Sequence, residues 1–186
     1  MTRIFPLTAL ALALTTLFPA SASATLVGDT VTAVFSGGQT VASPGSAEVG
    51  PGVEFNIGLP GSVNTSPIMT VDVGDGTVTF TSRQIFFLGS DRLDLGDLDW
   101  IGPPGRIVGF TILPGGQIPG LTESDVTFTD DSLSVNFSGI FLSGAGLSTT
   151  IELDVEHGIV PEPGSLGLLL LGGLLGLGWA RRSAAA

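Results

Sequence analysis

Four aspartates lie close together in the middle of the chain, and their side chains are the first candidates for chemistry. Asp91, Asp94, Asp97 and Asp99 fall within nine residues. Calcium takes about six to eight oxygen ligands, mostly carboxylates and loop carbonyls, so these residues are a candidate calcium site. Their spacing matches neither the EF-hand loop nor the glycine-rich nonapeptide repeat. Leucines alternate with the acids, which also fits an edge strand with an acidic face toward solvent. Calcium is the one cofactor that the sequence suggests.

Glu54 and His157 are the single residues that could act as an acid or a base, and each also has an ordinary structural explanation. Glycoside hydrolysis needs two carboxylates that face each other, and Glu54 draws attention because apolar Val53 and Phe55 flank it. The alternative is an exposed strand residue. His157 is the one histidine and precedes Gly158. We expect it to be a solvated strand end, which fits a Ser-His-Asp triad poorly.

The composition excludes several classes of site. Because the chain has no cysteine, it has no disulfide, no thiolate metal site and no cysteine nucleophile. Because it has no lysine, it lacks the lysine of a phosphate-binding loop. The formal net charge of −11 disfavours nucleic acid as a partner, since no basic surface is available to neutralise phosphates. We therefore predict no catalytic residues and no enzymatic activity.

Three aromatic residues could form a platform for a sugar ring. Phe86 and Phe87 lie within the continuous apolar run 85–88, which favours a place in the core instead. Trp100 is followed by Ile101 and is also expected to be buried or half-buried. Tyrosine, a frequent interface residue, is absent. A carbohydrate-binding module is therefore an alternative function and not the first prediction.

The middle of the chain alternates apolar with polar residues, and this period of two predicts half-buried β-strands. Clusters of glycine, proline and aspartate separate the alternating segments and predict turns. Asp75-Gly76 and Asp130-Asp131 are the best hairpin candidates. Short strands at regular spacing favour an all-β body, a β-sandwich or a jelly roll, over residues 25–159. The predicted strands cover residues 31–35, 69–73, 78–80, 108–112, 126–128, 133–137 and 151–155.

Residues 1–24 contain the three parts of a secretory signal peptide in the right order. Arg3 supplies a positive start, residues 7–18 an apolar core, and Ala22 and Ala24 a small-x-small site for signal peptidase. The alternative is a buried N-terminal helix, which does not explain why the three features occur together. We therefore expect a signal helix in the precursor, signal peptidase as a processing partner, and export of the body.

The C-terminal end has the pattern of a membrane anchor. Residues 164–180 carry no charge, and a helix of that length spans about 25 Å, slightly less than a hydrocarbon core of about 30 Å. Trp179 lies where an interfacial aromatic is favoured, and Arg181 and Arg182 should stay on the cytoplasmic side. A buried core helix is the alternative. This transmembrane helix and the signal peptide together place the body outside the inner membrane.

A proline-rich box precedes the anchor, and the whole arrangement resembles a known sorting signal. Pro161, Glu162 and Pro163, then the apolar helix, then the arginine pair are similar to the PEP-CTERM signal of Gram-negative bacteria, many of which make exopolysaccharide. The resemblance covers residues 160–186. It implies recognition by exosortase, a membrane-embedded cysteine transpeptidase that cuts at or near the box and releases the protein or joins it to a surface acceptor. The two prolines also hold the backbone extended, as a protease requires.

These parts predict an exported protein whose ends are processing signals. Residues 1–24 are the signal peptide, 25–159 the β-sandwich body and 160–186 the sorting signal. The precursor is expected in the inner membrane, and the product in the cell envelope, at the surface or outside the cell. A structural or binding role, in association with an exopolysaccharide, is the expected function. A carbohydrate-binding module and, less favoured, a carbohydrate-active hydrolase are the alternatives.

Overall fold

The computed structural model describes residues 24–38, 40–115 and 117–158. The predicted signal helix, Ala22 of the predicted cleavage site and the entire C-terminal sorting signal lie outside these residues. Within them, no helix has the length and apolar character needed to cross a membrane.

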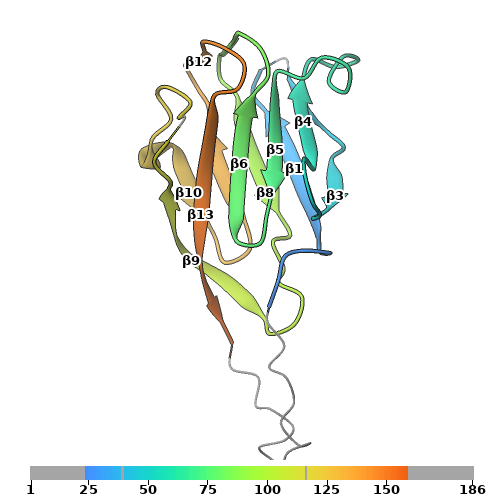
Figure 1. The fold of residues 1–186 in the computed structure, drawn as a ribbon, viewed down its shortest axis with the longest axis vertical. Helices are drawn as coiled ribbons and strands as arrows, with labels where there is room; N and C mark the ends of the chain where they lie inside the picture. Colours follow the sequence, from blue (N-terminus) through green and yellow to red (C-terminus); the bar gives the residue numbers. More distant parts are fainter. Residues whose placement is uncertain (1–23, 39, 116, 159–186) are drawn as a thin grey trace, which may run out of the picture. The chain divides into compact units, whose positions relative to one another are not determined.

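The described strands form two larger sheets and one small one (Figure 1). Across the first sheet lie β10 (Val126–Phe128), β11 (Leu133–Asn136), β8 (Arg92–Gly96), β1 (Thr30–Ser36) and β3 (Ser46–Glu48). Across the second lie β2 (Val41–Ser43), β4 (Phe55–Gly58), β5 (Met69–Val73), β6 (Thr77–Ser82), β13 (Ser148–His157) and β9 (Gly105–Ile112). The small sheet, here the β7–β12 ribbon, pairs β7 (Phe86–Leu88) with β12 (Ile140–Leu142). A 3-10 turn, Glu123–Asp125, precedes β10.

One apolar core joins the two larger sheets. Side chains in β1 and β6 alternate between buried and more exposed, as a period of two requires. The ring of Phe137, just after β11, packs against Phe35 of β1 at 6.0 Å and against Phe80 of β6 at 5.4 Å between ring centroids. Phe35 belongs to the first sheet and Phe80 to the second, so the three rings connect the sheets directly. Aromatic pairs in such geometry add about 0.5–1.5 kcal/mol beyond their burial.

The all-β prediction is confirmed, and every strand pair among the described residues is antiparallel. The seven predicted segments correspond to β1, β5, β6, β9, β10, β11 and β13. Both predicted hairpins are present: Asp75-Gly76 joins β5 to β6, and Asp130-Asp131 joins β10 to β11. The strands β2, β3, β4, β7 and β12, each of three or four residues, are not among the predicted segments.

β8 corrects the expectation of an edge strand for the acidic segment. It pairs with β1 on one side and with β11 on the other, so it lies inside the first sheet. Leu93 and Leu95 are buried, whereas Asp94 between them is only half-buried. The alternation therefore gives the two faces of the strand correctly. It carries no information about how many neighbours the strand has.

The β7–β12 ribbon corrects the expectation that Phe86 and Phe87 both fill the core. Phe87 lies directly opposite Phe141 across the ribbon. Phe86 is half-buried, but Phe87 is 60% exposed and Phe141 is 51% exposed. A continuous apolar run favours a strand covered on both faces. Here the described residues cover only one face, and the other face meets solvent.

The strands run between two poles. The chain-end pole comprises residues 24–30, 48–54, 72–77, 97–106, 129–132 and 152–158, and it contains the first and the last described residues (Figure 1). Hydrogen bonds join its segments, for example from the Gly28 N–H to the Val49 carbonyl and from the Leu98 N–H to the Asp131 carbonyl. The distal pole comprises residues 36–38, 40–44, 58–68, 82–92, 122–125 and 136–148, and it includes the β7–β12 ribbon.

Candidate functional site at the chain-end pole

Asp91, the first of the four predicted calcium ligands, is a buried structural carboxylate of the distal pole. It is 2% exposed. Its Oδ1 accepts a hydrogen bond from the Thr40 hydroxyl at 2.7 Å, and its Oδ2 accepts one from the Gly89 N–H at 3.1 Å. Both oxygens therefore already bind groups of the protein, and the side chain ties the loop after β1 to the loop before β8.

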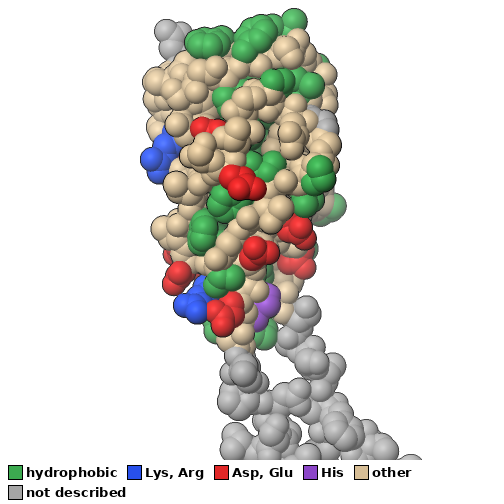
Figure 2. Space-filling model, turned by 90° about the vertical axis from the view of Figure 1, so that its left-hand side faces the viewer, with side chains coloured by type: hydrophobic (Ala, Val, Ile, Leu, Met, Phe, Trp, Pro, Cys, Tyr) green, Lys and Arg blue, Asp and Glu red, His purple; other side chains and the backbone are tan. Residues whose placement is uncertain are grey.

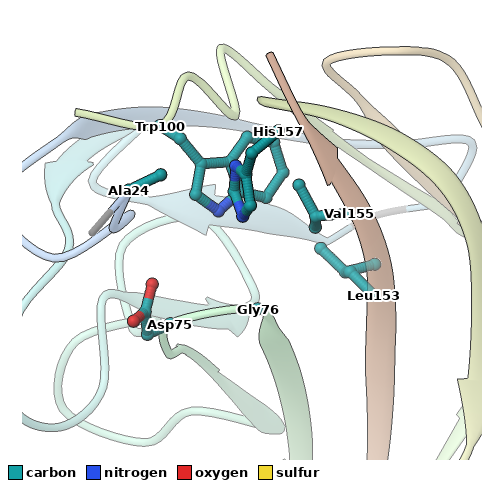
Figure 3. A pocket seen from close by; sticks show the side chains of 7 residues that line it. All are labelled: Ala24, Asp75, Gly76, Trp100, Leu153, Val155 and His157. Atoms are coloured by element: carbon teal, nitrogen blue, oxygen red, sulfur yellow. The ribbon is translucent and has the colours of Figure 1, made fainter. Parts of the chain in front are cut away.

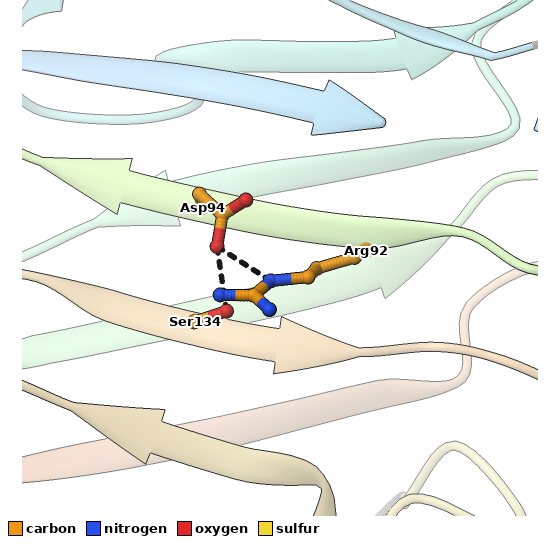
Figure 4. A network of polar contacts seen from close by, with 3 residues as sticks. All are labelled: Arg92, Asp94 and Ser134. Carbon is orange, nitrogen blue, oxygen red and sulfur yellow. Dashed lines mark hydrogen bonds and ion pairs between the residues drawn. The ribbon is translucent and has the colours of Figure 1, made fainter. Parts of the chain in front are cut away.

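Asp94 lies on the outward face of β8 in a different polar network. Its Oδ1 accepts hydrogen bonds from Arg92 Nε at 2.7 Å and from the Ser134 hydroxyl at 2.6 Å (Figure 4). Arg92 lies on the same strand and Ser134 on the neighbouring β11. The carboxylate thus links two strands of the first sheet across its exposed surface.

Asp97 and Asp99 belong to the loop that follows β8, at the chain-end pole. Asp97 has a φ of 58°, in the left-handed region that aspartate tolerates better than most residues. Within the described residues, no group of three or more histidine or acidic side chains is placed to hold a metal ion. The calcium site stays a prediction of the sequence. Its test is the melting temperature of the full chain in millimolar calcium, with EDTA to reverse any rise.

Glu54 is buried, so the expectation of an exposed strand residue is wrong. It is 9% exposed and precedes β4. Its Oε1 accepts a hydrogen bond from the Gly50 N–H at 3.0 Å, and its Oε2 accepts one from the Val73 N–H at 2.7 Å. The carboxylate closes the loop before β4 and holds it to the end of β5. This is a structural role, because both oxygens satisfy backbone donors.

A pocket of about 250 Å³ opens at the chain-end pole. Its walls come from both ends of the described chain and from the loops between strands (Figure 3). The lining residues are Ala24, Asp75, Gly76, Trp100, Leu153, Val155 and His157. Asp75 is the one carboxylate among them, so this pocket does not present the pair of facing carboxylates that glycoside hydrolysis requires.

Trp100 lines the pocket and contacts the last strand. It is 6% exposed, in agreement with the prediction, and its ring meets the His157 ring edge to face at 6.1 Å and 74°. His157 ends β13 and is exposed, as predicted. Gly105 makes this contact possible, because a Cβ there would lie 2.9 Å from the Trp100 ring and 3.0 Å from His157 Nδ1. No side chain larger than hydrogen fits between the two rings and β9.

One short loop, residues 101–104, holds both ends of the described chain. The Thr25 N–H donates to the Ile101 carbonyl at 3.2 Å, and the Ile101 N–H donates back to the Thr25 carbonyl at 2.8 Å. The Gly158 N–H donates to the Pro104 carbonyl at 2.8 Å. The first and the last described residues of the domain therefore lie side by side at one pole.

Two carboxylates also secure the N-terminal end of the described chain. Asp75, in the β5–β6 turn, accepts a hydrogen bond from the Leu26 N–H at 3.0 Å. Asp29 accepts one from the Asp99 N–H, also at 3.0 Å. Together with the 101–104 loop, these bonds fix the first described residues on three neighbouring segments of the pole.

The chain-end pole concentrates the negative charge of the domain. Its acidic residues are Asp29, Glu48, Glu54, Asp72, Asp75, Asp97, Asp99, Asp130, Asp131, Glu152, Asp154 and Glu156. Figure 2 shows most acidic side chains of one face in its lower half, toward the chain ends. Arg106, the arginine of this pole, pairs with Glu156 at 3.0 Å from Nε, and this hydrogen bond raises the pKa of its guanidinium. A surface of this kind repels other anionic surfaces and attracts cations.

Sequence reasoning missed the residues that fasten the chain ends. The sequence predicts Asp75 as a turn residue and Asp99 as a calcium ligand, but their hydrogen-bond partners Leu26 and Asp29 are 49 and 70 positions away. Gly105 lies in a Pro-Pro-Gly segment, which signals a turn and gives no sign that a tryptophan packs against it. Only the fold brings these positions together.

The comparisons with known proteins identify the segment that follows the pole. Residues 160–182 match the PEP-CTERM protein-sorting motif. The comparisons with curated proteins and with solved structures find no match. The matched segment confirms the resemblance drawn from the proline box, the apolar run and the arginine pair. It begins two positions after Gly158, the last described residue.

Proposed function

We propose that this chain is an exported envelope or matrix protein, in which a β-sandwich body is the finished product and the segments before and after it are processing signals. The sorting motif implies an exosortase-targeted exported protein with a membrane-anchored precursor. The structural or binding role of the body, its release to the surface and its association with exopolysaccharide are the further parts of this proposal.

The observation that carries the proposal is the position of the last fastened residue. The hydrogen bond from Gly158 to Pro104 precedes the matched segment 160–182. Cleavage within that segment therefore breaks none of the described contacts of the body. A domain that is cut from its anchor needs this arrangement, because its last strand must stay paired after the cut.

The charge of the chain-end pole supports the same function. A membrane surface with anionic lipids repels acidic groups within a Debye length, about 8 Å at physiological ionic strength. The acids of the chain-end pole lie at the same pole as Gly158, the last described residue before the sorting motif. Repulsion would hold the body away from the lipid and leave the proline box accessible to a membrane-embedded enzyme.

The test replaces Pro161, Glu162 and Pro163 by alanine in the full chain, expressed in a host that has exosortase. The box supplies the extended, prolyl backbone and the charge that the enzyme would recognise. We expect the variant to accumulate as a membrane-retained precursor, while the wild-type chain loses its C-terminal segment. Mass spectrometry of the C-terminus and cell fractionation measure both effects. Pro119→Ala, at an exposed loop proline, is the matched control and should be processed normally.

Two results would overturn the proposal. Normal processing of the triple-alanine variant would show that the box is not the recognition element. Recovery of the wild-type product with Trp179 and the arginine pair still attached would show that the anchor is not removed.

A further inference from the structure

Thr25 is fastened to the domain through both its backbone and its side chain. Its N–H and its carbonyl each bond with Ile101, and its Oγ1 accepts a hydrogen bond from the Val27 N–H at 3.1 Å. The Leu26 carbonyl accepts the Asp29 N–H at 2.9 Å, which closes a turn, and the Leu26 side chain is buried. The first residues of a domain are poorly ordered unless contacts tie them down. Here the contacts fix the position of the Thr25 nitrogen.

The Asp75 carboxylate lies close to that nitrogen. Its Oδ1 accepts the Leu26 N–H at 3.0 Å, and the nitrogens of consecutive residues are at most about 3.7 Å apart. The Thr25 nitrogen therefore lies within about 7 Å of this oxygen. Among the described residues, the Leu26 N–H is the one hydrogen-bond donor to this carboxylate. Figure 3 shows the carboxylate on the side of the pocket where Ala24 lies.

Cleavage after Ala24 changes the chemistry of the Thr25 nitrogen. Hydrolysis of this peptide bond consumes one water, and the new carboxylate leaves with residues 1–24. The Thr25 nitrogen takes up the released protons and becomes an ammonium at neutral pH, since an α-amine has an ordinary pKa of about 7.7–8.0. An uncharged amide with one N–H is thus replaced by a cation with three. Ala24 lines the pocket, so its departure also removes one wall beside the new group.

We propose that the chain-end pole contains a binding site for the α-ammonium group of the processed chain, formed by the Ile101 carbonyl and the Asp75 carboxylate. One N–H keeps the bond to Ile101 that the amide makes, and the charge pairs with Asp75, as a charge-assisted contact favours. Capture of an N-terminal amine is a known mode of recognition. The inference rests on the proposed function, because it requires the predicted signal-peptidase cleavage after Ala24.

This site makes the processed domain more stable than its precursor. Before cleavage the Thr25 nitrogen carries no charge, and Asp75 holds only the Leu26 N–H among the described donors. After cleavage the same carboxylate gains a cation, which in turn is kept protonated by the negative charge. Asp75 is exposed, so solvent screens the pair and its effect is modest. Removal of the signal peptide therefore adds a contact that completes this end of the domain.

Because the chain has no lysine, the α-amine is the only primary amine of the processed chain. An amine-selective succinimidyl ester therefore reports on this group alone. The test uses the full chain, exported in a host that has signal peptidase and no exosortase, and purified in detergent. Near pH 8 we expect Asp75→Asn to be acetylated at least threefold faster than the wild-type chain. The asparagine keeps an oxygen acceptor for the Leu26 N–H, so this variant removes the charge and leaves the hydrogen bond.

Asp130→Asn is the matched control, because Asp130 belongs to the same pole and its charge acts on Arg106. This variant should react at the wild-type rate. Equal rates for the wild-type chain and Asp75→Asn, or the same acceleration in Asp130→Asn, would overturn the proposal. The three chains should react alike in denaturant, and a difference that persists there would also overturn it, because the folded site would not be its cause.

The melting temperature gives a second readout. Acetylation removes the positive charge, so it should lower the melting temperature of the wild-type chain and leave that of Asp75→Asn unchanged. An equal drop in both would assign the effect to the bulk of the acetyl group and overturn the proposal. Mass spectrometry identifies the first residue, and a processed chain that does not begin at Thr25 would overturn it as well. The sorting function is tested separately, by C-terminal processing in a host that has exosortase.

Discussion

The two poles of the domain are built alike on the inside and differently on the outside. Each pole has one buried carboxylate that binds groups from two segments: Glu54 at the chain-end pole and Asp91 at the distal pole. Each also has a prominent aromatic, but Trp100 is 6% exposed whereas Phe87 is 60% exposed. The outer surface is acidic at one pole and apolar at the other.

This difference separates two tasks. At the chain-end pole, the aromatic ring and the polar groups hold the two ends of the described chain. This arrangement suits a domain that must stay folded after cleavage of its tail. The distal pole leaves apolar area in solvent that its own core does not use, and exposed contiguous apolar area is typical of an interaction surface. The contrast predicts that equivalent substitutions at the two poles have unequal effects.

The largest expected effect comes from the two aromatic residues. Trp100→Ala should lower the free energy of unfolding by about 3–5 kcal/mol, because a buried ring is lost. Phe87→Ala should change it by less than about 0.5 kcal/mol, as is usual for an exposed position. Chemical denaturation of the full-length variants in detergent measures both. Similar losses for the two variants would contradict the division between a structural pole and a contact pole.

The two buried carboxylates give the next effect, and here the poles should behave alike. Glu54→Ala and Asp91→Ala each leave buried donors without an acceptor, at a cost of about 2–3 kcal/mol. Since the two sites lie at opposite poles and share no partner, the double variant should lose the sum within about 0.5 kcal/mol. Thermal or chemical denaturation checks the additivity. A loss confined to one of the two variants would show that only that pole depends on its carboxylate.

The sequence predicts the core of the fold better than it predicts the poles. The alternation that identifies β1, β6 and β13 is a local pattern that reports which face of a strand is buried. Whether the run around Phe86 and Phe87 is covered on one face or on two depends on the neighbours of the ribbon, which no local pattern specifies. The same limit turns β8 from an expected edge strand into an interior one.

The candidate site also contains some parts that the sequence predicts and others that only the fold reveals. The sorting motif is a contiguous signal and could be identified from its residues alone. The fastening of Thr25 and Gly158 to one loop depends on partners far away in the chain. Glu54 is the clearest case: its flanking apolar residues gave a reason to notice it, but only the positions of the Gly50 and Val73 amides explain its burial.

A smaller effect is expected where the N-terminal end is fastened. Asp75→Ala removes the acceptor of the partly buried Leu26 N–H and should cost about 1 kcal/mol. The loss should be local, so amide hydrogen exchange at Leu26 should accelerate more than exchange in β1. Asp130→Ala, in the turn at the same pole, is the matched control and should leave exchange at Leu26 unchanged. Unchanged exchange in Asp75→Ala would show that the 101–104 loop alone holds this end.

The smallest effect is expected from the exposed ion pairs, one on the first sheet and one at the chain-end pole. Arg92 pairs with Asp94, and Arg106 pairs with Glu156. Glu156 raises the pKa of the Arg106 guanidinium in the folded state. Any stability that this pair contributes is therefore fully present at a pH below the pKa of Arg106 in the unfolded state. It is lost only as the pH rises through the higher pKa of the folded state. Both lie far above neutrality, and we therefore expect Arg106→Ala to leave the melting temperature unchanged between pH 6 and pH 9, as for Arg92→Ala. Differential scanning calorimetry checks this, and a clear drop for Arg106→Ala alone would show that the acidic pole depends on its arginine to limit repulsion among its carboxylates.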